Sequence, residues 1–358
     1  MNMNFMGYSI IRVGCISALL ICTFISNTSL ARGSHAFWIS KTHANLNKIE
    51  NYSATMELST STNSTPVISQ VKFKKPYDFQ LIISSPDDLK GLETSFNNRS
   101  ILMHNPINQS VLKIDGLKSP TKESKLEQVK SIYWYNQEHY EQVFTPSIHI
   151  AERLSVGLDF IAKDEQADIL TTKTFIDYHH SIFMQADYLL KSGGSARVKN
   201  TVIDFNQSHI EFAAAPIADN SKITYWDFNR ASLTDKQVEE NISAKIHWPK
   251  DIENVWGLSH HQFYQQNNNQ TAAGYFYNDA FFVIALTQPI KSKQVVNPQW
   301  PLMHGMPFTI NETPAYLFPY PSFTTIEFER QGIRYILLAN IHPQSLIDMA
   351  SGIILAVD

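Results

Sequence analysis

Two histidine pairs are the residues in this chain whose types and spacing could hold a metal ion. They are His179-His180 and His260-His261, and the segments around them show the pattern of strands. Neighbouring side chains on a strand point to opposite faces of the sheet, so the two imidazoles of one pair cannot ligate the same ion as neighbours. The sequence therefore predicts ordinary histidines and no metal site.

One short motif has the spacing of a catalytic pair. Ser119-Pro120-Thr121-Lys122 matches the S-x-x-K pattern, but a loop with a proline is not the helical turn that places lysine beside serine. The chain has no H-E-x-x-H, G-x-S-x-G, phosphate-loop or dinucleotide-binding pattern. We therefore expect no catalytic residue, no cofactor and no enzymatic activity. A hydrolase with a site assembled from distant residues is the remaining catalytic alternative.

The charge and the cysteine content limit the partners that the chain can have. The formal net charge is −4, and no segment after the first 31 residues is a basic tract. Nucleic acid is therefore not predicted as a partner. Both cysteines, Cys15 and Cys22, lie within those first residues. The rest of the chain consequently has no thiol for a disulfide or a thiolate metal site.

Residues 1–31 have the pattern of a secretory signal peptide. They contain Arg12, an apolar run over residues 13–25, and Ser29-Leu30-Ala31 with small residues at the positions that a signal peptidase reads. The alternative is an uncleaved membrane anchor, but the apolar run is shorter than the roughly 18–20 residues that a spanning helix needs. We expect cleavage near Ala31 and export to the periplasm.

The elements that would position any site begin with a series of two-faced strands over residues 51–115. Apolar and polar residues alternate, which is typical of strands with one buried face. Pro76 interrupts one strand because it has no N–H to donate. The predicted antiparallel meander thus has one continuous apolar face, which we interpret as the wall of a ligand cavity, and its members are Tyr52, Met56, Leu58, Val71, Phe73, Phe79, Leu81, Ile83, Ile101 and Met103.

Two helices and a second group of strands are predicted after the meander. The first helix covers residues 120–140, and the second begins near Ser147. The second helix has an apolar stripe that we expect to lie over the sheet as a lid, formed by Ile150, Leu154, Leu158 and Ile161. Strands are then predicted over residues 172–178, 181–190 and 196–206, with a tight turn at 191–194.

A change in composition at residues 213–220 predicts a linker between two domains, residues 34–212 and 221–358. The chain length also favours two domains. The second is predicted to be a smaller α+β domain, with a helix over 234–242, strands over 273–277, 280–287, 324–330 and 333–340, and a final helix that begins at Pro343.

The meander resembles the LolA-like family of periplasmic lipoprotein carriers. The residues of the resemblance are Phe73-Lys74-Lys75-Pro76, Phe79 and the Asn105-Pro106 turn. The family implies an incomplete, curved antiparallel barrel lidded by helices, whose cavity holds the acyl chains of lipoproteins. The family has arginine, which latches the lid, where this chain has Lys75. Lysine lacks the planar five-donor fork of arginine, so the latch is in question.

The C-terminal part resembles the second domain of the MucB/RseB family of sigma-factor regulators, which also begin with a LolA-like domain. The similar features are Trp248-Pro249, the strands around residues 281–286, and the hairpin and helix over residues 324–354. This resemblance is one of pattern and implies a protein partner for residues 221–358, a segment of an anti-sigma factor.

The sequence therefore predicts an α+β protein with a LolA-like half-barrel lidded by helices and a smaller C-terminal domain. The function expected first is the binding of lipid or lipoprotein acyl chains, as a carrier in lipoprotein localisation or as a lipid sensor. The alternative is an RseB-like negative regulator in envelope stress. A pure carrier needs only the half-barrel, so the extra domain favours regulation, whereas the absence of recognisable RseB motifs over residues 172–206 argues against it.

Overall fold

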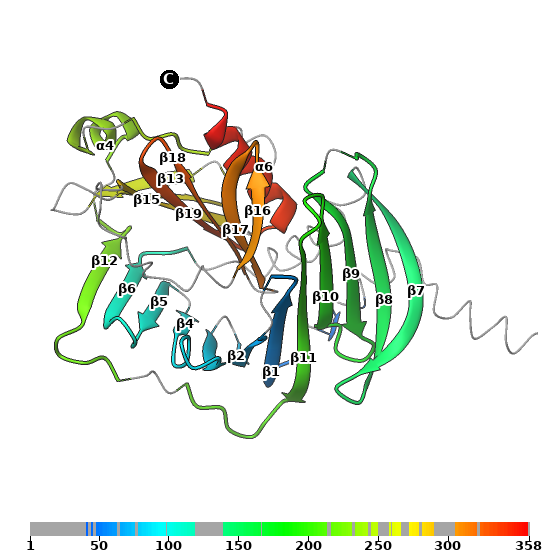
Figure 1. Ribbon diagram of the computed structural model, residues 1–358. Coiled ribbons are helices and arrows are strands. Elements are labelled where there is room, and N and C mark those ends of the chain that lie inside the picture. The colour runs from blue at the N-terminus through cyan, green and yellow to red at the C-terminus, as the bar shows by residue number, and fades with distance from the viewer. Residues whose placement is uncertain are drawn as a thin grey trace, which may run out of the picture.

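The computed structural model shows a protein built mainly from strands (Figure 1). It describes residues 41, 44–45, 48–62, 65–75, 78–97, 99–118, 139–165, 167–212, 216–230, 233–242, 245–249, 258, 260–265, 272–278, 281–289, 305–320 and 323–356. The expected signal peptide at residues 1–31 lies outside these residues, as does the expected helix at 120–140 up to residue 138.

A 12-stranded sheet, called the first sheet here, forms the larger layer in the order β12-β6-β5-β4-β3-β2-β1-β11-β10-β9-β8-β7. All neighbours pair antiparallel except β12 and β6, which are parallel. The strands are β1 (Asn51–Thr60), β2 (Val67–Lys74), β3 (Asp78–Ser85), β4 (Glu93–Asn97), β5 (Ser100–Asn105), β6 (Ser110–Asp115), β7 (Tyr140–Ile150), β8 (Arg153–Ala162), β9 (Ile169–Asp177), β10 (Phe183–Leu190), β11 (Ser195–Phe205) and β12 (Lys222–Asp227). Among the described residues its two edge strands do not pair, so the sheet is open.

The predicted strands of the meander are confirmed, because the alternation along the chain sets the register. Tyr52 pairs with Phe73, Phe73 with Phe79, and Phe79 with Phe96. Residues that pair across strands lie on the same face of a sheet. One face is therefore apolar across five consecutive strands, and we call it the inner face because it packs on the second sheet described below.

The predicted helix at Ser147 and its lid are wrong. Strands β7 and β8 form a hairpin there, and its turn residues Ala151 and Glu152 both have positive φ. Leu154 and Leu158 on β8 are four residues apart, a spacing that places side chains on one face of a strand as well as of a helix. Ile150 lies on β7 and pairs with Arg153, so it is on the other face. Gly157 favours close pairing of the strands, because a Cβ there would collide with Thr145.

A second sheet of seven strands follows in the order β13-β14-β15-β19-β18-β17-β16, with all neighbours antiparallel. Its strands are β13 (His260–Gln265), β14 (Ala272–Tyr277), β15 (Phe282–Pro289), β16 (Met306–Ile310), β17 (Thr313–Tyr320), β18 (Phe323–Arg330) and β19 (Ile333–Ala339). The described helices are α4 (Asp235–Ile242) and α6 (Pro343–Ile354). Each helix and strand that was predicted within this region is confirmed.

The path between the sheets passes through the edge of the first sheet. After the expected linker, β12 pairs in parallel with β6, and Tyr225 on β12 donates a hydrogen bond from its hydroxyl to Asp115 at 2.8 Å. The chain then continues to α4 and β13, where Leu233 forms a bridge with Phe263. A short parallel strand thus connects the two sheets on the side where β12 lies near β13 (Figure 1).

The first sheet curves around the second sheet and α6 (Figure 1). One cluster of buried apolar side chains continues from the inner face into the second sheet and α6. Shared burial of this kind is the main force that holds two layers together. Within the part of the chain that is described, no helix has the length and apolarity to cross a bilayer.

Candidate functional site

The ten residues predicted to form the wall of a ligand cavity all lie on the inner face of the first sheet. Cross-strand pairs join them from β1 to β5. Eight of the ten are buried, and they are Met56, Leu58, Val71, Phe79, Leu81, Ile83, Ile101 and Met103. The single apolar wall is therefore confirmed, whereas a ligand on it stays a prediction.

A cavity of about 70 Å³ lies where this wall meets the second sheet. Predicted residues Leu81, Ile83 and Met103 line it from the first sheet. Further lining residues of the first sheet are Leu92, Glu93, Thr94, His104 and Ile114, and those of the second sheet are Leu286, Phe318, Phe323, Thr325, Ile336 and Leu338. The walls are mostly apolar, so water gains little by entering, and an apolar group would fit the space.

Beside the cavity, the first and second sheets contact each other through aromatic rings. Phe323 on β18 lies edge-on to Phe79 with ring centroids 6.2 Å apart, and its centroid is 5.3 Å from that of Phe96 on β4. Phe96 also faces Phe282 on β15 at 6.5 Å. Offset and edge-to-face ring pairs contribute roughly 0.5–1.5 kcal/mol beyond the burial of their area. The side chains of these four residues contain no polar atoms and therefore form an apolar contact between the sheets.

Polar contacts join α6 to the other half of the first sheet. The side-chain oxygen of Gln344 accepts a hydrogen bond from the backbone N–H of Ile169 at 3.0 Å and one from the hydroxyl of Tyr140 at 3.4 Å. That hydroxyl also lies 2.9 Å from the carbonyl oxygen of Ile169. His342 caps the helix, since its Nδ1 accepts from the N–H of Gln344. These directional contacts fix where α6 lies on strands β7 and β9.

The remaining predicted residues are not at the cavity. Tyr52 stacks on Phe73 with centroids 5.3 Å apart, and both rings are half-buried. The proposed lid residues lie on β7 and β8, where Ile150 and Leu158 are buried while Leu154 and Ile161 are exposed. Lys75, the proposed latch, forms an ion pair with Glu50 at 2.8 Å.

Sequence reasoning missed the half of the cavity that comes from the second sheet. The signal for it was the alternation over residues 324–330 and 333–340, which predicted a two-faced hairpin but not the surface that its buried face contacts. Strand β4 was also missed, although Phe96 is central to the ring contact. Its sequence, Glu-Thr-Ser-Phe-Asn, contains a single large apolar residue and therefore gives no alternating pattern.

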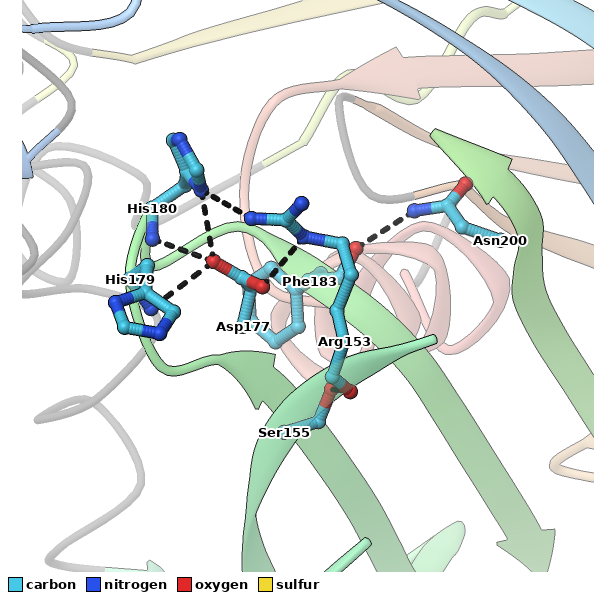
Figure 2. Close-up of polar contacts among 7 residues, drawn as sticks. All are labelled: Arg153, Ser155, Asp177, His179, His180, Phe183 and Asn200. Atoms are coloured by element: carbon cyan, nitrogen blue, oxygen red, sulfur yellow. Dashed lines mark hydrogen bonds and ion pairs between the residues drawn. The ribbon is translucent and has the colours of Figure 1, made fainter. Parts of the chain in front are cut away.

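A polar cluster lies at the turns between β7 and β8 and between β9 and β10 (Figure 2). The side chain of Asp177 is fully buried, and its Oδ2 accepts from the Nε of Arg153 at 2.7 Å. Its Oδ1 accepts from the backbone N–H of His179 at 3.0 Å and of His180 at 2.5 Å. The Nδ1 of His180 lies 3.0 Å from Oδ1 and 2.6 Å from the Nη2 of Arg153.

The electrostatics of this cluster favour a charged Asp177. Burial alone would raise the pKa of Asp177, but the hydrogen bonds from Arg153 and His180 outweigh burial and lower it. A protonated His180 ring donates to Asp177, whereas a neutral ring with its hydrogen on Nε2 accepts from Arg153. The imidazole of His180 stacks on Phe205 with centroids 3.9 Å apart. The side chains of Arg153, Asp177 and His180 thus join the turn between β7 and β8 to the turn between β9 and β10.

The side chains of His179, His180 and Ser155 make local contacts, whereas those of His260 and His261 lie outside the described side chains. His179 and His180 lie in the turn after β9, not on the expected strand, and the ring of His179 contacts Tyr178 edge-on at 5.3 Å. Ser155 is buried and its hydroxyl donates to the carbonyl of Arg153 at 3.3 Å (Figure 2). No group of three or more His, Cys, Asp or Glu among the described residues could hold a metal ion.

The comparisons with known proteins give likenesses of structure. No family model matches the chain, and no curated protein matches its sequence. The crystal structure of MucB is 8% identical, covers 89% of this chain and 96% of that chain, and has a TM-score of 0.46. The MucA/MucB complex of Pseudomonas aeruginosa is 10% identical, covers 89% and 97%, and has a TM-score of 0.43.

A LolA superfamily protein from Nitrosomonas europaea is also similar to the chain. It is 10% identical, covers 47% of this chain and 94% of that chain, and has a TM-score of 0.22. The resemblance to LolA-like and MucB/RseB proteins that the sequence suggested is therefore also found among solved structures. At such identities the likeness concerns the fold.

Proposed function

We propose that the protein is a non-enzymatic binder of lipid or lipoprotein acyl chains, and that the chain enters between the two sheets. The observation that supports this proposal is the apolar cavity enclosed by Met103 and Leu81 on one side and Phe323 and Leu338 on the other. The contact beside it consists of phenylalanine rings, which carry no polar atoms, so separating these side chains leaves none of their groups without a hydrogen bond.

The size of the cavity favours a sensor over a carrier. Sites for small molecules enclose about 300–1,000 Å³, whereas this cavity has about 70 Å³. A long acyl chain therefore fits only when the second sheet moves away from the wall. Binding is then coupled to the position of the second sheet, which is what a lipid-sensing protein requires.

The free energy gained by burying an acyl chain is partly offset by the cost of separating the second sheet from the wall. Each buried methylene contributes about 0.8 kcal/mol, so ten methylenes contribute about 8 kcal/mol, which corresponds to a micromolar dissociation constant before costs. The exposure of Phe323 and its ring partners offsets part of this gain. We expect weak to moderate affinity that rises with chain length.

A variant that fills the cavity tests the proposal. Met103→Trp places a larger side chain in the space and is expected to weaken the binding of a fluorescent fatty acid at least tenfold. Leu102→Trp, on the opposite face of β5, is the matched control and should bind as the natural protein does. Thermal melting checks that both variants fold. Equal binding by both variants would remove the cavity as the ligand site.

The proposal places the protein in the periplasm after cleavage near Ala31. N-terminal sequencing of the protein recovered from the periplasmic fraction tests this location. A chain that begins before residue 31, or one that stays with the membrane after a salt wash, would contradict it. Native mass spectrometry of the same sample would show any acyl ligand that the protein acquires in the cell.

A second candidate is an RseB-like regulator that binds an anti-sigma factor through its C-terminal part. The observation that favours it is the open edge of the second sheet, since within the described residues β16 pairs with β17 alone. Extended peptides bind such edges through main-chain hydrogen bonds. Calorimetric titration with the periplasmic segment of an anti-sigma factor tests this candidate, and absence of heat at micromolar concentrations would exclude it.

A further inference from the structure

A buried ion pair lies on the cavity side of the second sheet. Phe323 and Thr325 on β18 line the cavity, as do Ile336 and Leu338 on β19. Side chains two residues apart share a face of a strand. Glu327 therefore lies on the same face of β18 as Phe323 and Thr325, and Arg334 lies on the same face of β19 as Ile336 and Leu338. Glu327 also pairs across the strands with the lining residue Ile336.

Arg334 is buried, Glu327 is half-buried, and the pair is incompletely satisfied. Arg334 is 5% exposed, and its Nε forms an ion pair with the Oε1 of Glu327. The other carboxylate oxygen, Oε2, is buried and has no hydrogen-bond partner among the described residues. Burying two charges costs more solvation energy than their attraction commonly returns, so such a pair contributes little to stability. Its position beside an apolar cavity fits a role in binding.

We propose that Arg334 is the headgroup site of an amphiphile whose apolar chain occupies the cavity, and that the anionic headgroup replaces Glu327 as the partner of the guanidinium. The headgroup is a phosphate or a carboxylate, which the planar guanidinium fork binds through two parallel hydrogen bonds. This inference rests on the proposed function, because it assigns the polar end of the same ligand.

The spacing along β19 suits an amphiphile. Two residues of a strand span roughly 7 Å, so the backbone of Arg334 lies that far from the backbone of Ile336. A chain in the cavity thus ends within reach of the guanidinium. Burial raises the pKa of Glu327 even though Arg334 is near. The carboxylate of Glu327 is therefore poorly stabilised, and a ligand anion can displace it from the guanidinium.

The experiment compares charged and neutral ligands that share one acyl chain, with the full chain. Hexadecanoate, hexadecyl phosphate and uncharged monohexadecanoylglycerol are titrated against a displaceable fluorescent probe. The natural protein is expected to bind the two anions about tenfold more tightly than the neutral lipid, because hydrogen bonds to charged groups are stronger than those between neutral groups. Equal affinity for the three ligands would overturn the headgroup site.

Two variants assign the preference to this pair. The double variant Glu327→Leu with Arg334→Met removes both charges and leaves no unpaired polar side chain at either position, and it should bind all three ligands equally. Glu327→Gln alone frees the guanidinium and should bind the anions several-fold more tightly. A matched control is Asp187→Asn with Arg197→Met, which removes a partly exposed ion pair of the first sheet. A preference for anions that persists in the double variant would overturn the proposal.

The outcomes separate this inference from the proposed function. If no ligand binds the natural protein, both proposals fail, whereas equal binding of all three refutes the headgroup site alone. Inorganic phosphate is added as a competitor: competition at millimolar concentration shows that Arg334 takes the free anion, and its absence shows that the acyl chain is required. If the double variant does not fold, Arg334→Lys replaces it and should reduce the preference about threefold, since lysine lacks the fork.

Discussion

The two halves of the first sheet contact the rest of the protein in different ways. Strands β3 to β6 meet the second sheet through the rings of Phe79, Phe96 and Phe323, with a cavity beside them. Strands β7 to β10 are joined to each other at one end by the buried Asp177 and to α6 by Gln344. The first half is held mainly by apolar area, whereas the second half adds hydrogen bonds and charge to its own buried apolar side chains, among them Ile150, Ile169 and Met184.

This difference indicates which half can change. Apolar contacts tolerate displacement because they have no fixed geometry, whereas hydrogen bonds to buried groups are lost with small movements. The half with Asp177 and Gln344 is therefore expected to stay fixed, and the half around Phe323 is expected to open for a ligand. Four predictions test this contrast.

The largest effect is expected at Asp177. Asp177→Ala leaves the guanidinium of Arg153 without its buried partner, so the free energy of unfolding should fall by about 3–5 kcal/mol. Asp187→Ala, which removes the half-buried partner of the exposed Arg197, should cost less than about 1 kcal/mol. Urea denaturation of both variants measures the difference. Similar losses for the two variants would contradict the role given to Asp177.

Removal of the ring at Phe323 should weaken folding and favour the ligand. Phe323→Ala is expected to cost about 3 kcal/mol through lost burial and to enlarge the cavity. Phe328→Ala is the control on the opposite face of β18, where the ring stacks on Tyr335 at 5.1 Å. Both should lose similar stability, but only Phe323→Ala should bind a fluorescent fatty acid more tightly. Identical binding by the two variants would refute the opening of this half.

Acid should weaken the contact of α6. Burial lowers the pKa of His342 from 6.5 to about 4. Between these two pH values the folded protein binds fewer protons than the unfolded chain. The stability that the neutral His342 contributes is therefore fully present above pH 6.5 and is lost as the pH falls toward 4. His342→Asn keeps a capping side chain that does not titrate. Denaturation at several pH values should show a flatter profile for this variant, and an unchanged profile would exclude His342 as the cause.

The smallest effect is expected at Lys75. Its ion pair with Glu50 is 2.8 Å long, but the carboxylate is largely exposed. Lys75→Met should therefore change the free energy of unfolding by less than about 1 kcal/mol. It should also leave fatty-acid binding unchanged. A loss of binding without a loss of stability would restore the latch that the resemblance to lipoprotein carriers implied for this position.

Several features of the fold could be predicted because they depend on near neighbours in the chain. The alternation from Tyr52 to Leu58 determines which face of β1 is buried, and pairing with Phe73 follows from the hairpin. Pro343 marks the start of α6. The segment with Leu154 and Leu158 was misread, because a spacing of four residues fits both a helix and a strand. Its turn, at Ala151 and Glu152, contains no glycine, asparagine or proline that would have indicated a hairpin.

Only the half of the candidate site that lies on the first sheet could be predicted from the sequence. Leu81, Ile83 and Met103 follow from alternation, but the surface that covers them comes from residues more than 180 positions later in the chain. The local sequence around Phe323 and Leu338 does not predict which layer of the protein these side chains will contact. The sequence also does not predict the burial of Glu327 and Arg334, since charged residues near a hairpin turn normally face solvent.

The sequence by itself determined the strands, their buried faces and the apolar wall, because the side-chain period of a strand is a local property. Only the tertiary structure decided that the second sheet covers this wall, that a small cavity remains between them, and that one arginine is buried beside it. The physical reason is that the hydrophobic effect is not directional: it requires each apolar face to be covered but does not specify by which partner.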